Sequence, residues 1–144
     1  MSILYFAYGA NLDREAMSRR CPGAMVRERA ILADHELVAM RQGWLSIAPR
    51  PESRTEGLIW ALEDEHLEAL DEYEEVAQGL YIHERRTVET INGATVEVLV
   101  YVGTNSGPGR LRAEYAGRVA KAARTELGPE AAGIIEALRA EPAS

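Results

Sequence analysis

The stretch DEHLEALDEYEEVAQGLY, residues 64–81, is rich in acidic residues and places one of them on the apolar face of a predicted helix. Wound as an α-helix at about 100° per residue, it places Leu67 and Leu70 together on one apolar face. Glu74 comes one heptad after Leu67 and one turn after Leu70, so it projects only about 20° and about 40° from them. A carboxylate on that face loses hydration and its pKa rises, which suits a general acid or base that works near neutral pH.

The other ionisable groups of this stretch are expected on its solvated surfaces. Asp71 falls on the flank and His66 faces solvent, and the remaining glutamates lie opposite or lateral to the leucines: Glu65, Glu68, Glu72 and Glu75. An alternative for Glu74 is a fraying last turn in which its side chain swings out to solvent or meets Arg85 or Arg86. One acidic residue on a helical wheel does not decide between these interpretations.

Bulk composition limits the classes of protein. With 144 residues, the chain is interpreted as one domain spanning residues 1–144. A net charge of −7 and a pI near 5.0 argue against a nucleic-acid partner. No apolar run approaches the ~18 residues of a membrane helix, and the N-terminus lacks the basic segment of a signal peptide, so a cytoplasmic protein is expected. The single cysteine, Cys21, excludes an intrachain disulfide and is predicted to be a half-buried packing thiol.

The N-terminal segment combines a buried strand with a glycine turn. Residues 3–8, ILYFAY, form an apolar and aromatic run that ends at Gly9. Gly9 permits positive φ and close backbone approach, and Asn11 is predicted to be the N-cap of a helix over residues 12–20. Such a turn presents backbone N–H groups and the positive end of a helix dipole, which suit a carboxylate or a phosphate. Dinucleotide and Walker glycine patterns are absent.

Further along the chain, alternating segments predict a sheet. The expected elements are two or three strands within residues 24–50, a polar loop at 49–55, a buried strand at 56–62, a hairpin about Asn92-Gly93, a loop at 104–109 and helices at 110–127 and 129–140. Mostly sequential strands with short connections favour a small, largely antiparallel sheet or barrel that carries helices.

The chemistry available to this fold is limited. His35, His66 and His83 are far apart in the sequence and form no HxxxH pair, so no metal site is predicted. No GxSxG motif is present, and Asp71 and Glu74 lie too close on one helix to flank a glycoside. A desolvated glutamate and a backbone-lined glycine turn remain. That combination suits proton transfer together with binding of an oxyanion or a carboxylate.

Two of these stretches together resemble the γ-glutamyl cyclotransferase (AIG2-like) family. The segment LYFAYGANL at 4–12 resembles the family's YGSNL signature, and LDEYEEV at 70–76, followed by GLY at 79–81, is similar to its LDxxEGV…GxY segment. Tyr115 matches a tyrosine on the substrate side of the family's site. Three departures stand out: Ala10 replaces the usual serine, Glu75 replaces the usual glycine, and the proline usual just before the late tyrosine is missing.

The resemblance implies an α+β fold, a small mixed and mostly antiparallel β-barrel with flanking helices, and a reaction without cofactors. It implies that a γ-glutamyl compound is bound as substrate and that Glu74 acts as general acid and base, releasing 5-oxoproline and a free amine. The implied substrate-binding residues are Tyr5, Phe6, Ala7, Tyr8, Gly9, Ala10, Asn11, Tyr81 and Tyr115. A monomer or a homodimer is expected.

Several alternatives stay open at this point. Tyr5 and Tyr8 also suit the core of the first strand, Tyr81 a structural strand position, and Tyr115 packing within its own helix. The departures at Ala10 and Glu75 also suit a module of the same fold that binds without turnover. A third alternative is another acid/base enzyme, such as a small lyase or hydrolase, that uses Glu74. The identity of the leaving amine is open.

Overall fold

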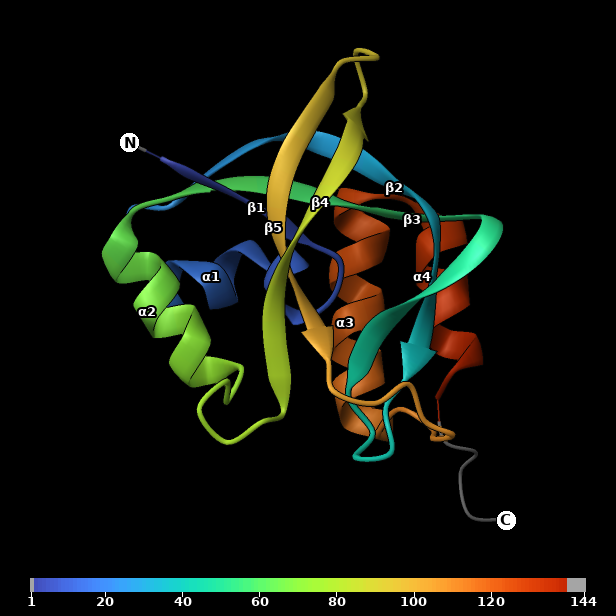
Figure 1. Cartoon of the computed structure of the whole chain (residues 1–144). Helices are drawn as coiled ribbons and strands as arrows, with labels where there is room; N and C mark the ends of the chain where they lie inside the picture. Colours follow the sequence, from blue (N-terminus) through green and yellow to red (C-terminus); the bar gives the residue numbers. More distant parts are fainter. Residues whose placement is uncertain (1, 140–144) are drawn as a thin grey trace.

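Five strands close into a barrel in the computed structural model, which describes residues 2–139 (Figure 1). The strands are β1 (Ile3–Ala7), β2 (Met25–Ala39), β3 (Leu45–Leu62), β4 (Tyr81–Thr90) and β5 (Thr95–Gly103). Their order around the barrel is β1-β3-β2-β4-β5, and all neighbours pair antiparallel except β1 and β5, which pair parallel. The predicted fold class, a mixed and mostly antiparallel barrel, is confirmed.

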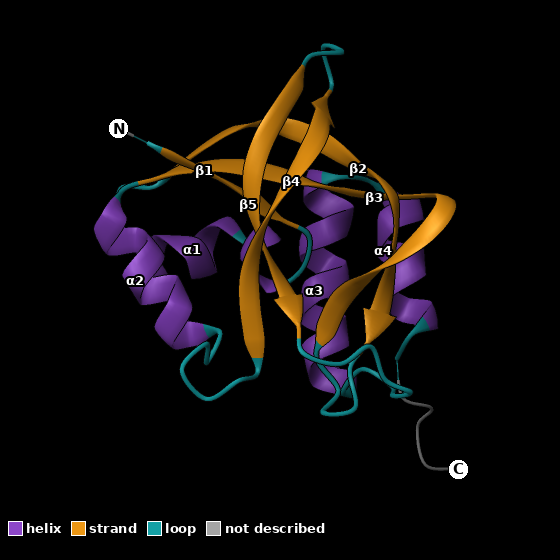
Figure 2. Cartoon of the chain, in the orientation of Figure 1, coloured by secondary structure: helices purple, strands orange, loops and turns teal. Residues whose placement is uncertain are grey.

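Helices cover two sides of the barrel (Figure 2). They are a 3-10 turn, η1 (Ala10–Leu12), and four α-helices: α1 (Arg14–Arg20), α2 (Asp64–Tyr73), α3 (Ala113–Glu126) and α4 (Pro129–Ala137). α1 and α2 lie on one side, and α3 and α4 pack together on the other (Figure 1). The predicted break between the last two helices is confirmed, because Gly128 has a positive φ of 113° and Pro129 opens α4.

The predicted polar loop at residues 49–55 is wrong, because this segment belongs to β3. Pro49 pairs with His35 and Arg54 with Ala33 on β2, with a register shift between them. Most side chains from residue 49 to residue 54 are exposed, so their polar composition reflects a strand arm that faces water. The prolines are tolerated there because the ladder is irregular.

The start of the first helix also differs from the prediction. Asp13, not Asn11, is the N-cap of α1, and its carboxylate accepts hydrogen bonds from the N–H groups of Glu15 and Ala16. Asn11 lies inside η1 with only 2% of its surface exposed. The side chain of Asn11 is therefore free for another role.

The start of α2 is anchored by a buried histidine. His66 is 6% exposed, which corrects the prediction that it faces solvent. Its Nδ1 accepts the N–H of Glu63 at 3.0 Å, and its Nε2 lies 2.7 Å from the carbonyl oxygen of Pro22. Cys21 beside it is 1% exposed, more buried than predicted. The imidazole thus ties α2 to the corner that follows α1.

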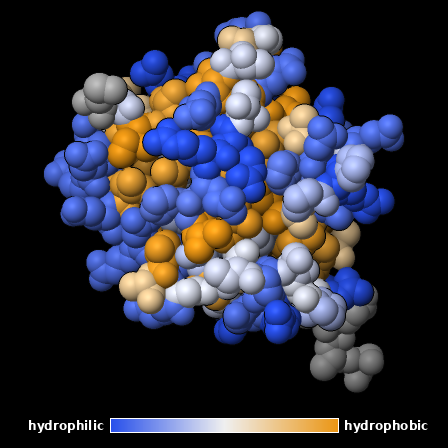
Figure 3. All heavy atoms as spheres, viewed as in Figure 1, coloured by the Kyte–Doolittle hydropathy of each residue, from blue (hydrophilic) through white to orange (hydrophobic). Residues whose placement is uncertain are grey.

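The β4–β5 hairpin confirms the Asn92-Gly93 turn. The N–H of Gly93 donates to Thr90, and pairing runs from Tyr81 opposite Gly103 to Glu89 opposite Thr95. Figure 3 shows hydrophilic residues on the surface of the molecule where this hairpin lies. The loop predicted after β5 is present as well. No helix within residues 2–139 has the length and apolar character needed to cross a bilayer.

Candidate active site

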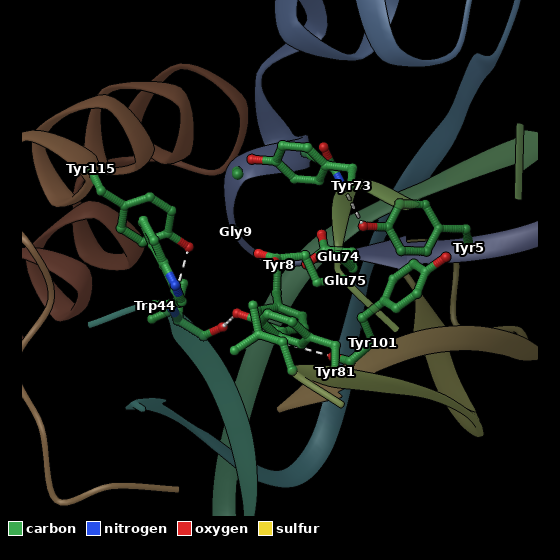
Figure 4. Close-up of a pocket in the computed structure, with 14 residues that line it drawn as sticks. Tyr5, Tyr8, Gly9, Trp44, Tyr73, Glu74, Glu75, Tyr81, Tyr101 and Tyr115 are labelled. Atoms are coloured by element: carbon green, nitrogen blue, oxygen red, sulfur yellow. Dashed lines mark hydrogen bonds between the residues drawn. The ribbon is translucent and has the colours of Figure 1, made fainter. Parts of the chain in front are cut away.

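A cavity of about 180 Å³ opens where the end of α2 meets the turn after β1 (Figure 4). Its wall is mainly aromatic and contains two carboxylates. The lining residues are Tyr5, Tyr8, Gly9, Ala10, Asn11, Trp44, Leu45, Tyr73, Glu74, Glu75, Leu80, Tyr81, Tyr101 and Tyr115. They come from six separate segments of the chain, so the barrel, the end of α2 and α3 form the cavity together.

Glu74 stands at the C-cap of α2, where the helix is closed rather than frayed. The N–H of Glu75 donates to Glu72 at 3.1 Å and the N–H of Val76 donates to Asp71 at 3.0 Å, the two bonds of a Schellman motif. Leu70, one turn earlier, is fully buried at 0% exposure. The half-buried Glu74 side chain enters the cavity (Figure 4). α2 ends at Tyr73, and the rest of the stretch is a turn that leads into β4 at Tyr81.

The cavity changes the proton affinity of this carboxylate. Burial raises the pKa of Glu74 to about 7, an effect that nearby Glu75 strengthens and that Arg20 opposes. Burial also raises the pKa of the lining tyrosines Tyr5, Tyr8, Tyr81, Tyr101 and Tyr115 above the ordinary value, so their hydroxyls are neutral. At neutral pH Glu74 is thus present in both protonation states, as proton transfer in both directions requires.

Arg20 joins the glycine turn to α2. Its Nη1 donates to Oδ1 of Asn11 at 2.6 Å, and its Nη2 donates to the hydroxyl of Tyr73 at 2.9 Å, with the guanidinium 3.7 Å above the Tyr73 ring. Asn11 in turn donates from Nδ2 to the hydroxyl of Tyr5 at 2.9 Å. The chain of contacts Tyr5, Asn11, Arg20, Tyr73 fixes the two halves of the cavity wall relative to each other.

Replacing Arg20 with methionine should raise the pKa of Glu74 further, because the positive charge of the guanidinium lowers it. The expected shift is roughly one pH unit upward. It is measured by NMR titration of the Glu74 carboxyl carbon. Arg19→Met is the matched control, because within residues 2–139 Arg19 pairs with exposed Glu15 and with no residue of the cavity wall. An unchanged or lower pKa in Arg20→Met would contradict this electrostatic role.

The two tyrosines predicted from later parts of the chain support the opposite wall. The hydroxyl of Tyr115 accepts the N–H of Leu45 at 3.2 Å, and the hydroxyl of Tyr81 donates to the carbonyl oxygen of the same residue. Trp44 packs edge-on against Tyr115, with ring centroids 5.0 Å apart (Figure 4). Tyr81 and Tyr115 therefore line the cavity and hold the start of β3 beside it.

The floor of the cavity is held by hydrogen bonds to β5. Tyr8 donates to the carbonyl oxygen of Tyr101 at 2.6 Å, and the hydroxyl of Tyr101 donates to Oδ1 of Asp71 at 2.6 Å. Asp71 lies three residues before Glu74, so this bond fixes the end of α2 against the barrel. Sequence reasoning missed Tyr101, Trp44, Leu45, Tyr73 and Leu80, because their contacts with the site join distant parts of the chain.

Two of the predicted substrate residues do not reach the cavity. Phe6 and Ala7 are 0% and 1% exposed and are absent from its wall. The side chain of Phe6 lies on the other face of β1 from Tyr5, as the period of a strand requires. Gly9 does line the cavity, but its φ is −133°, so positive φ is not its role. A Cβ at Gly9 would lie 3.3 Å from Leu45 Cδ2, so close approach explains this glycine.

The turn supplies main-chain donors. Within residues 2–139, no acceptor is found for the backbone N–H groups of Gly9, Ala10 and Asn11, all of which line the cavity. No group of three His, Cys, Asp or Glu side chains in the described part of the chain is arranged to hold a metal ion. The site therefore offers one titrating carboxylate, neutral hydroxyls and free amides, a set suited to proton transfer at a bound oxyanion or carboxylate.

Comparisons with known proteins identify the family of the chain. Residues 5–119 match the model of the family described as "Gamma-glutamyl cyclotransferase, AIG2-like". The chain is 32% identical to the bovine protein named "Gamma-glutamylcyclotransferase" and 32% identical to the human protein of the same name. Each match covers 72% of this chain but only 61% of the mammalian protein, so the chain spans about three fifths of these curated relatives.

Solved structures extend the similarity over the whole fold. A structure named "Gamma-glutamyl cyclotransferase" superposes with a TM-score of 0.89 at 26% identity and covers 100% of this chain and 92% of its own. A crystal structure of an uncharacterised human protein superposes with a TM-score of 0.87 at 27% identity and covers 99% and 91%. The barrel and the flanking helices are thus a shared arrangement.

Proposed function

The chain belongs to the AIG2-like γ-glutamyl cyclotransferase family, and from this membership we propose that it releases 5-oxoproline and a free amine from a γ-glutamyl compound. The observation that carries the proposal is the carboxylate of Glu74, whose pKa is about 7, on the wall of a cavity whose other side is main chain from the β1 turn. Intramolecular ring closure requires this pair of features, a proton acceptor and an anion-binding wall.

In the proposed reaction the glutamyl part of the substrate lies between Glu74 and the turn at Gly9 to Asn11. Ionised Glu74 takes a proton from the α-ammonium group, and the freed amine attacks the γ-carbonyl carbon. The new C–N bond closes a five-membered ring and places negative charge on the γ-oxygen. Backbone N–H groups of Gly9 and Ala10 are proposed to stabilise this oxyanion.

The second half of the reaction uses the same carboxyl group. Protonated Glu74 donates its proton to the leaving nitrogen, the bond from that nitrogen to the γ-carbon breaks, and the carbonyl re-forms. The second proton of the ring nitrogen passes to the released amine, which leaves as an ammonium ion. The products are 5-oxoproline and the amine, and Glu74 is ionised again. A pKa about 7 suits both steps, because neither proton transfer is then strongly unfavourable at neutral pH.

The fold's main contribution is to hold the substrate in its folded conformer. Nucleophile and electrophile belong to one molecule, and well-oriented closures of this kind reach effective molarities of ~10⁵ M or more. The hydroxyls of Tyr5 and Tyr115 are proposed to contact the bound glutamyl part, in addition to their hydrogen bonds within the protein. No cofactor is needed for these steps.

The proposal is tested with purified protein and a panel of γ-glutamyl compounds, with 5-oxoproline and the released amine measured together. Equal amounts of both products are expected. The α-glutamyl isomers serve as the matched control, because closure onto their γ-carboxylate cannot release the amine. Binding of the γ-glutamyl compounds without 5-oxoproline would instead indicate a binding module, and turnover without it a different acid/base enzyme.

Compartment and assembly are part of the same proposal. We expect one domain over residues 1–144, active in the cytoplasm as a monomer or a homodimer. A net charge of −7 also makes nucleic acid an unsuitable partner. Light scattering on the purified protein measures the assembly directly.

A further inference from the structure

Glu75, the second carboxylate on the cavity wall, has a backbone conformation that glutamate rarely adopts. Its φ is 53°, in the left-handed region, and it occupies the position after the C-cap of α2. Helices commonly place glycine at this position, because a Cβ disfavours the conformation. The chain therefore carries strain to keep a glutamate here, and strain of this kind concentrates at functional sites.

The backbone of Glu75 has structural partners, but its side chain does not. Its N–H donates to Glu72, and its carbonyl oxygen accepts the N–H groups of Gln78 and Leu80 at 3.1 Å each. Glycine would make all three of these bonds equally well. Within residues 2–139 the carboxylate itself forms no hydrogen bond and no ion pair, and the residue is exposed. The fold thus gives no reason for an acidic side chain at this position.

The cavity wall has a one-sided charge. Glu74 and Glu75 are its acidic residues, and neither lysine nor arginine is among the described residues that line it. Arg20, the cation that acts on Glu74, is not among the lining residues, and its guanidinium donates to Asn11 and Tyr73. Figure 4 shows Glu75 next to Glu74 on the same side of the cavity. A ligand part near Glu75 therefore meets a negative charge that forms no ion pair within residues 2–139.

We propose that Glu75 makes the enzyme select γ-glutamyl compounds whose leaving amine carries a second positive charge, as in a γ-glutamyl diamine, over those whose leaving amine carries a carboxylate. This inference rests on the proposed function. The glutamyl part is the same in every such substrate and lies against Glu74 and the turn. Charge on the leaving side is the property that an exposed residue beside the base can distinguish.

The selectivity is measured as a ratio of kcat/KM values for two substrates whose leaving amines share the same five-carbon chain. The leaving amine of γ-glutamylcadaverine carries a positively charged ammonium group at its far end. The leaving amine of γ-glutamylpentylamine ends in a methyl group and lacks this charge. An exposed ion pair changes such a ratio by up to about fivefold, so the wild type should favour the cadaverine compound by that factor. γ-Glutamylalanine, which leaves with a carboxylate, should be poorer than both. High salt should reduce these differences, because it screens exposed charges.

Three variants give the control. Glu75→Gln should bring the cadaverine to pentylamine ratio to about one, and so should Glu75→Gly, which suits a φ of 53° and cannot fail through backbone strain. Glu72→Gln removes a neighbouring exposed glutamate outside the cavity wall and should keep the wild-type ratio. A wild-type ratio that survives in both Glu75 variants would overturn the inference.

Failure of the inference is separable from failure of the proposed function. Turnover of γ-glutamylpentylamine to 5-oxoproline tests the function without involving charge on the leaving side. The dissociation constants of the two compounds are also measured by calorimetry in the Glu74→Gln variant, and their ratio is compared. This measurement does not need turnover. Equal affinities for the two compounds there, with Glu75 intact, would reject the role of Glu75 whatever the reaction.

Discussion

Glu74→Gln should lower kcat for 5-oxoproline release by about 10²- to 10⁴-fold, the range ascribed to a positioned general acid or base. Glutamine has nearly the same shape, so the cavity and its hydrogen bonds stay in place, but the amide neither takes a proton from the α-ammonium group nor returns one to the leaving nitrogen. The rate is measured at saturating substrate, with 5-oxoproline quantified directly.

The control for this variant is another glutamate of the same helix. Glu72 is exposed and absent from the cavity wall, so Glu72→Gln should keep kcat within about twofold of the wild type. Dissociation constants for the substrate should change little in either variant. Similar 5-oxoproline yields from Glu74→Gln and the wild type would remove Glu74 as the base.

The stability of Glu74→Gln checks that its fold is intact. A carboxyl group whose pKa is raised on folding, here from 4.5 to about 7, makes the folded state bind more protons than the unfolded state between these values. The free energy of unfolding of the wild type therefore falls as the pH rises through this window, by up to roughly 3 kcal/mol. Glutamine lacks this penalty, so above pH ~7 the variant should unfold at higher urea than the wild type.

The position of Glu74 was predictable because it depends on local geometry. α2 ends at Tyr73, yet Glu74 keeps near-helical dihedral angles, φ −83° and ψ 3°. Its side chain consequently leaves the helix in the direction that the wheel of Leu67 and Leu70 predicts. The end of β1 at Gly9 and the Asn92-Gly93 hairpin were predictable for the same reason, since each is specified by a few adjacent residues.

The supporting residues of the site were not predictable, because each acts through a distant partner. Arg20 donates hydrogen bonds to Asn11 and Tyr73, and Tyr101 donates one to Asp71. The helix and strand periodicity of the sequence does not indicate that these residues lie close together. The prediction for His66 failed for the same reason. A helical wheel places it towards water, but the corner after α1 covers that side of α2 and buries it. Local patterns do not say which polar faces become covered.

Gly57→Ala should reduce the free energy of unfolding by about 2–3 kcal/mol, the usual cost of overpacking a well-filled core. A Cβ at Gly57 in β3 would lie 2.4 Å from the carbonyl oxygen of Ala7 and 2.7 Å from two ring atoms of Phe6. Phe6 is fully buried, so its ring cannot withdraw. Ala7 ends β1, and moving it shifts the turn that lines the cavity, so 5-oxoproline release should fall as well.

Gly117→Ala is the matched control, with the opposite expected sign. Gly117 lies inside α3, and a Cβ there would meet nothing within 4 Å. Alanine in a helix interior is favoured over glycine by about 1 kcal/mol, so this variant should be slightly more stable than the wild type and equally active. Urea unfolding of the two variants separates close packing at one position from a general effect of added methyl groups. Equal stability of Gly57→Ala and the wild type would mean that β1 and β3 can move apart, and the turn beside Glu74 would then not be rigidly placed.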